Sequence, residues 1–152
     1  MTKLTLLATL IALLVATSAT AATPTQYRAK VNSICRTYTP TFKKLEATMT
    51  KAQKANDGQA YGIALGQLLV LGLVQDARIE REPVPLALRA QMTPLITRFK
   101  KIDVHIRAAL AAAKANDPTR MGAELTAAGK IGAGFNAKLD AAGLRDCGSN
   151  QP

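Results

Sequence analysis

The chain of 152 residues is poor in the side chains on which most active sites depend. It has no tryptophan, three tyrosines, three phenylalanines and a single histidine, His105. Proteins that bind single-stranded nucleic acid stack bases on aromatic rings, so this composition argues against a nucleic-acid partner. Nucleophilic triads and most zinc sites need histidine beside a serine, a cysteine or further ligands, and the sequence offers no such set. We therefore predict no catalytic residue and no metal ligand.

Acidic residues and cysteines are also few. Ten carboxylates accompany 20 lysines and arginines, and Glu80 with Glu82 cannot meet on one helix face, so paired acid–base catalysis has no candidates. The C-x-x-C-H motif that attaches haem covalently is absent. Non-covalent haem would need His105 with an internal methionine, but those methionines fit core positions. No cofactor is therefore predicted.

Long apolar runs are few, and the first of them lies near the start of the chain. Lys3 is followed by the uncharged stretch 4–15 and then by Ala19-Thr20-Ala21, the order of features that signal peptidase recognises. This stretch of 12 residues is short for a bilayer, which takes ~20. Residues 1–21 are therefore predicted to be a cleaved signal peptide.

Cleavage after Ala21, or one residue later, leaves a single domain of residues 22–152. Its net charge is +9 instead of +10, because Lys3 leaves with the signal. A basic surface attracts cell-wall polymers, anionic lipid headgroups and acidic proteins, and it also keeps an exported protein soluble. We expect this domain to be extracellular, periplasmic or associated with the cell wall, and not to be an integral membrane protein.

Apolar residues recur at the three- and four-residue spacing of amphipathic helices. This periodicity predicts four helices, at residues 25–56, 59–81, 85–116 and 118–142. Pro40 and Pro94 lie inside the first and third helices, and because the apolar stripes continue across them we expect kinks and not breaks. The second helix is apolar nearly all round over 60–74, which predicts burial on most sides.

The connections between these helices predict how they are arranged. Lys54-Ala55-Asn56-Asp57 recurs as Lys114-Ala115-Asn116-Asp117, where Asn suits the left-handed end of one helix and Asp the cap of the next. A proline-containing turn at 83–85 separates the two hairpins. The predicted fold is all-α, an antiparallel up-down-up-down four-helix bundle. The glycines of 129–134 lack the features of a phosphate loop, and we expect them to weaken the fourth helix locally.

Cys35 and Cys147 are the two cysteines of the chain. In an antiparallel bundle the end of the fourth helix lies near the start of the first, and export places both thiols where disulfides persist. We therefore predict an internal disulfide, with two free thiols or an intermolecular pair as the alternatives.

The segments around these cysteines carry a resemblance. Asn32-Ser33-Ile34-Cys35-Arg36 and Ala142-Gly143-Leu144-Arg145-Asp146-Cys147 resemble a family of small exported helical proteins of actinobacteria and related high-GC bacteria. Such proteins pair an early N-x-I-C cysteine with a closing G-L-x-x-C. The resemblance implies the helical fold and the disulfide and brings no activity with it.

One edge of the third predicted helix is basic. Arg98, Lys101 and His105 share this edge, Lys100 lies beside it, and we predict that these four residues contact anions. The sequence thus predicts an exported, non-enzymatic helical domain that associates with anionic cell-envelope polymers, lipid headgroups or a protein partner. The alternative is a carrier of a small apolar ligand or haem, held between the glycine- and alanine-rich seams of the bundle.

Overall fold

The described part of the chain is built from helices joined by short turns. A computed structural model describes residues 22–151, and the predicted signal peptide, residues 1–21, lies outside the described residues. The elements are α1 (Pro24–Lys54), α2 (Gly58–Glu80), the short 3-10 helix η1 (Leu86–Leu88), α3 (Arg89–Lys114), α4 (Pro118–Gly132) and α5 (Phe135–Ala141). No strand occurs within residues 22–151, so the predicted all-α class is confirmed.

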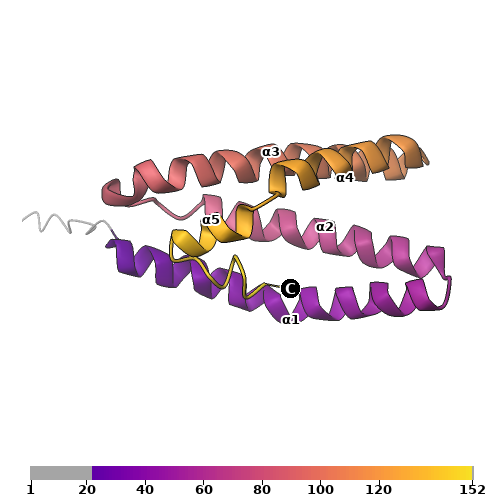
Figure 1. Cartoon of the computed structure of the whole chain (residues 1–152), viewed down its shortest axis with the longest axis horizontal. Helices are drawn as coiled ribbons and strands as arrows, with labels where there is room; N and C mark the ends of the chain where they lie inside the picture. Colours follow the sequence, from indigo (N-terminus) through magenta and orange to yellow (C-terminus); the bar gives the residue numbers. More distant parts are fainter. Residues whose placement is uncertain (1–21, 152) are drawn as a thin grey trace, which may run out of the picture.

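The helices form two antiparallel hairpins that lie side by side. The first consists of α1 and α2 and the second of α3 and α4, and the chain runs up, down, up and down along the long axis (Figure 1). Most contacts between helices lie within each hairpin, and the contact of α2 with α3 joins the two. The predicted up-down-up-down order is therefore confirmed.

The helix ends follow the local signals in the sequence. The Thr23 hydroxyl accepts from the backbone N–H of Gln26, whose side chain accepts from the Thr23 N–H, so α1 begins with a capping box. Both predicted cleavage positions precede Thr23, so the cap stays in the mature chain. At the far ends of the hairpins, Asn56 and Asn116 take left-handed φ angles of 52° and 53°.

An aspartate then caps the second helix of each hairpin. The side chain of Asp57 accepts from the backbone N–H of Ala60, and that of Asp117 from the N–H of Arg120, both at 2.9 Å. The repeated Lys-Ala-Asn-Asp segments therefore make the same turn twice, as predicted. Both turns lie at the same end of the molecule (Figure 1).

The helices that contain prolines run without interruption. Pro40 lies inside α1 and Pro94 inside α3, so each predicted helix is one element across its proline. Near the first of these, the Cys35 carbonyl accepts from the Thr39 hydroxyl at 3.1 Å and from the Gln151 amide at 3.3 Å. Pro40 removes the backbone donor for the Arg36 carbonyl, so these two side-chain bonds lie one residue before the carbonyl that proline leaves without its helical partner.

The fourth predicted helix is two elements, which corrects the single helix expected over 118–142. The helix α4 ends at Gly132, Gly134 adopts a left-handed φ of 68°, and α5 begins at Phe135. Glycine has low helix propensity and enters the left-handed region without strain, so this glycine-rich stretch ends the helix. The break directs α5 across the molecule, where it packs on the core instead of continuing along α3.

The core occupies the end of the molecule where α5 lies. Side chains from α1, α2, α3, α5 and the C-terminal tail are buried there, among them Tyr27, Val31, Ile79, Met92, Leu139 and Leu144. Toward the hairpin turns the buried apolar side chains are alanines: Ala52, Ala64, Ala109, Ala112 and Ala128. The two hairpins are therefore thin, closely packed pairs away from the shared core.

The helix α2 is more exposed than its composition predicts, which corrects the expectation of burial on most sides. In its most apolar window of 18 residues, 11% is buried. By length and composition it is the one helix within residues 22–151 that could cross a membrane. Ile63, Val70 and Val74 are 57%, 49% and 44% exposed. The reason lies in the arrangement of the hairpins, because α1 and α3 flank α2 and its outward side meets no other helix.

Candidate functional site

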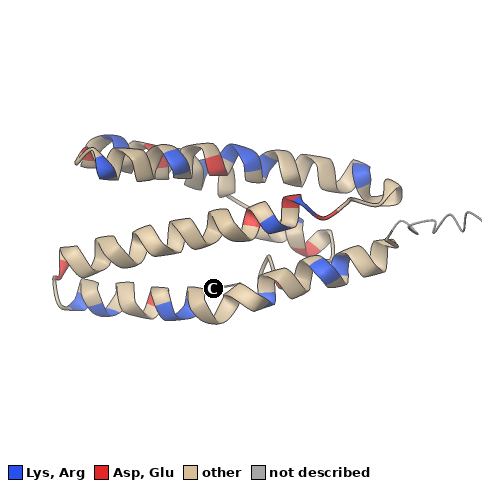
Figure 2. Cartoon of the chain, turned by 180° about the vertical axis from the view of Figure 1, so that it is seen from behind, with Lys and Arg blue, Asp and Glu red and all other residues tan. Residues whose placement is uncertain are grey.

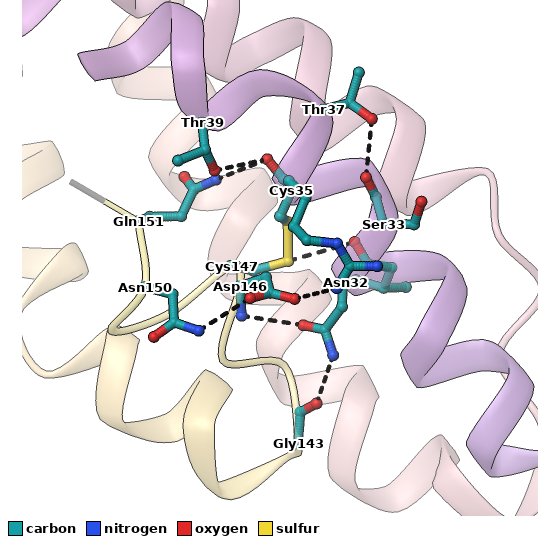
Figure 3. The surroundings of a disulfide bond; sticks show 12 residues. Asn32, Ser33, Cys35, Thr37, Thr39, Gly143, Asp146, Cys147, Asn150 and Gln151 are labelled. Atoms are coloured by element: carbon teal, nitrogen blue, oxygen red, sulfur yellow. Dashed lines mark hydrogen bonds and ion pairs between the residues drawn. A yellow bond between two sulfur atoms is a disulfide. The ribbon is translucent and has the colours of Figure 1, made fainter.

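A disulfide fastens the C-terminal tail to the first helix. Cys35 and Cys147 are bonded, with their Cα atoms 5.2 Å apart, and no free cysteine remains (Figure 3). The internal disulfide is thus confirmed, and both alternatives are wrong. It closes a loop of 112 residues, for which the chain-entropy model gives ~4.7 kcal/mol. A disulfide persists in an oxidising compartment, so the chain belongs outside the cytosol.

Polar contacts surround this bond. The Asn32 amide donates to the Gly143 carbonyl at 2.9 Å and its oxygen accepts from the Asp146 N–H at 3.1 Å (Figure 3). Arg36 forms an ion pair with Asp146. The hydrogen bond from Asn150, together with Arg36, lowers the pKa of the Asp146 carboxyl. The residues on which the family resemblance rests therefore hold the tail in place, and their role here is structural.

Arg98, the first residue of the predicted anion-contact edge, binds within the chain. Its guanidinium donates to the carbonyls of Ile131 and Ala133 and lies 5.3 Å from the ring centre of Phe135. These carbonyls end α4 and have no helical partner, so Arg98 satisfies them where the chain turns into α5. Its donors are thus engaged at the junction between these helices.

The other residues of that edge differ in their surroundings. The His105 ring nitrogen Nδ1 contacts the Glu124 carboxylate at 2.7 Å, which ties α3 to α4. The Lys100 ammonium lies 3.8 Å from Glu80 of α2. Lys101 is exposed and forms no ion pair with an acid of residues 22–151. The structure therefore leaves one of the four predicted residues fully available to an outside anion.

A larger cationic surface lies on α1 and was not predicted. This lysine face consists of five exposed lysines: Lys30, Lys43, Lys44, Lys51 and Lys54. At ~100° per residue they span about 140° of the helix, opposite the buried stripe. Glu46 is the one acid in α1, and none of the five lysines pairs with an acid of residues 22–151. Figure 2 shows blue positions recurring along α1.

The sequence contained a signal for this surface. The lysines fall between the apolar residues that define the first predicted helix, so the same periodicity places them on its outer side. The prediction favoured the third helix because Arg98, Lys100, Lys101 and His105 are clustered within eight residues. The prediction followed the cluster of charges on the third helix and therefore did not include the lysine face, which is spread over 25 residues of α1.

Two carboxyls face each other where α2 meets α3. Asp76 and Asp103 lie close enough for each to affect the ionisation of the other. Burial, followed by the charge of Asp103 and with a smaller effect of Glu80, raises the pKa of Asp76 to about 8. Burial also raises the pKa of Asp103, while the nearby positive charge of Arg107 lowers it. One proton is therefore held between the two hairpins at neutral pH.

Asp76 also lines a pocket between α2, α3 and α5. Its volume is about 190 Å³, below the ~300 Å³ at which ligand sites usually begin. Gln75, Asn136 and Gln151 add polar groups to its wall, and His105 is not among the lining residues. This pocket gives no support to the carrier alternative. In the described part of the chain, no three histidine, cysteine, aspartate or glutamate side chains gather as a metal site would require.

Comparison with known proteins adds no function. No family model matches the chain, and neither a curated protein nor a solved structure matches it. The resemblance to exported actinobacterial proteins therefore stays a prediction.

Proposed function

We propose that this protein is an exported, non-enzymatic helical domain that binds anionic polymers of the cell envelope through the lysine face of α1. The observation that carries the proposal is the set of five exposed lysines, none of which pairs with an acid among residues 22–151. Lysine ammonium groups are compact, mobile charges that suit repeated phosphate or carboxylate groups without fixed geometry.

Export supports the same proposal. The disulfide requires an oxidising compartment, and the predicted signal peptide supplies a route to it. Wall polymers and lipid headgroups of a cell envelope carry anionic groups that attract a basic protein. Attraction to them needs no pocket, and α1 presents a flat row of charge along a helix of 31 residues.

The test uses two variants with the same net charge. In the first, Lys43, Lys44, Lys51 and Lys54 become Gln. In the matched control, four exposed cations outside α1 become Gln: Lys114, Arg120, Lys130 and Lys138. Co-sedimentation with purified cell wall is measured at increasing salt, and circular dichroism checks that both variants remain helical.

We expect the α1 variant to lose at least about tenfold in affinity at low salt, since each lysine near an anionic surface contributes ~1 kcal/mol. The control should lose much less, and wild-type binding should fall steeply as salt rises. Equal losses in the two variants would show that net charge alone matters and would contradict the proposed face. Binding that is insensitive to salt would contradict the proposed function itself.

A further inference from the structure

An apolar groove framed by arginines lies on the outward side of α2. Val70, Leu73, Val74 and Ala77 line it, with a volume of about 480 Å³. Three guanidiniums surround these side chains: Arg78 and Arg81 at the C-terminal end of α2, and Arg107 from α3. Arg78 also lies 5.4 Å from the ring centre of Tyr38, which positions it toward α1. The groove thus combines an apolar floor with a positive rim.

The apolar surface continues beyond the groove. Ile63, seven residues before Val70 on the same side of α2, is 57% exposed. Val104 is 64% exposed and lies on α3 between Lys100, which pairs with Glu80 of α2, and Arg107, which lines the groove. The spacing of four and three residues places Val104 on the same side of α3 as Lys100 and Arg107, which both border α2. Figure 2 shows a long uncharged stretch of α2, drawn in tan, between its charged ends.

Three acids at the border of α2 and α3 carry little free negative charge. Glu80 is paired with Lys100, and the proton shared by Asp76 and Asp103 removes one of the two charges at the seam below the groove. The surroundings of the groove are therefore positive at neutral pH. A partner that fits must present anionic groups beside apolar ones.

An apolar surface bordered by positive charge favours a partner that is both apolar and anionic. We propose that the face formed by Ile63, Val70 and Val74 of α2 and Val104 of α3 docks on an anionic lipid bilayer, with its arginines on the headgroups. Docking of this kind places the apolar side of a helix ~5–10 Å into the boundary between headgroups and acyl chains. The strip from Ile63 to Val74 is ~16 Å long.

A second copy of the chain fits this face less well. Two-fold pairing would place the groove of one molecule on that of the other, because such interfaces use the same patch on both subunits. If the two-fold axis passed through the groove, Arg78, Arg81 and Arg107 would approach the same three arginines of the other copy, and these like charges would repel. Anionic lipid headgroups instead neutralise these arginines, and the acyl chains contact the apolar valine side chains. This site is separate from the lysine face of α1.

The test is co-sedimentation of the exported protein with vesicles of phosphatidylglycerol and phosphatidylcholine. It is run at about 0.1 M and about 1 M salt, where the screening length falls from ~10 Å to ~3 Å and the attraction of exposed lysines is largely lost. One variant carries Val70→Ser with Val74→Ser. Its control is Leu86→Ser, which also removes an exposed apolar side chain, 78% exposed, outside the groove.

We expect wild-type protein to remain on the vesicles at high salt and the double variant to bind about tenfold more weakly at both salts. The Leu86→Ser protein should bind as wild type does. At low salt, Arg81→Gln should weaken binding more than Arg120→Gln, which removes an exposed cation from α4. Equal binding of the double variant and wild type, or no wild-type binding at low salt, would overturn the proposal. A wild-type dimer that the double variant loses would assign the face to a second copy and would also overturn it.

Discussion

At the scale of single residues, charge in this protein is divided between structural and available groups. Arg98, Arg36 and His105 each bind a partner within the chain, whereas the lysines of α1 do not. Guanidinium and imidazole groups have fixed geometries that suit carbonyl and carboxylate partners, while lysine stems stay mobile in solvent. The charged residues that stabilise the fold are therefore largely distinct from those that remain available to other molecules.

The shared proton at Asp76 makes stability depend on pH. The folded protein keeps this proton up to about pH 8, while the unfolded chain releases it near 3.8. The free energy of unfolding should therefore fall as pH rises between these values and stay level above about 8. Asp76→Asn keeps a neutral group that resembles the protonated acid, so we expect it to raise the melting temperature at pH 8 and to change it little at pH 4. Thermal unfolding followed by circular dichroism measures both, and an equal shift at the two pH values would contradict the buried proton.

At the scale of helices, the sequence predicted where the helices begin and end better than it predicted which neighbours surround them. The two Lys-Ala-Asn-Asp turns follow from local backbone preferences and were predicted correctly, because Asn56, Asp57 and their repeats act within one turn. The glycines of 129–134 indicated a weak point in the fourth helix, but the sequence did not show that Arg98, 36 residues before Gly134, binds the carbonyls at the break. The exposure of α2 was missed for a similar reason, since hydrophobicity does not show which neighbours are present.

The junction of α4 and α5 gives a prediction at this scale. Replacing Arg98 with Gln removes charged hydrogen bonds to the Ile131 and Ala133 carbonyls and the contact with the Phe135 ring. We expect a loss of about 2 kcal/mol in the free energy of unfolding, measured by denaturant titration. Lys101→Gln, an exposed change three residues along α3, should alter stability by less than ~0.5 kcal/mol. Equal midpoints for the two variants would show that Arg98 does not hold the junction.

At the scale of the whole molecule, a single core and one disulfide hold together two hairpins that are otherwise thin. The predicted bundle and disulfide were correct, because apolar periodicity and two cysteines constrain them strongly. The lysine face was not part of the predicted anion-contact edge. Its lysines are far apart in the sequence, although they share one side of a long helix. The molecule that results has a cationic α1 and an apolar outward side on α2.

The most direct test of the central claim is a map of lysine protection on the bound protein. Purified protein is acetylated in the presence and absence of purified cell wall, and mass spectrometry measures the extent of acetylation at each lysine. We predict that Lys43, Lys44, Lys51 and Lys54 become protected on binding, while the exposed Lys130 of α4 and Lys138 of α5 react equally in both conditions. Protection of Lys130 and Lys138 to the same degree, or no protection on α1 in protein that sediments with the wall, would contradict the assignment of the lysine face as the binding surface.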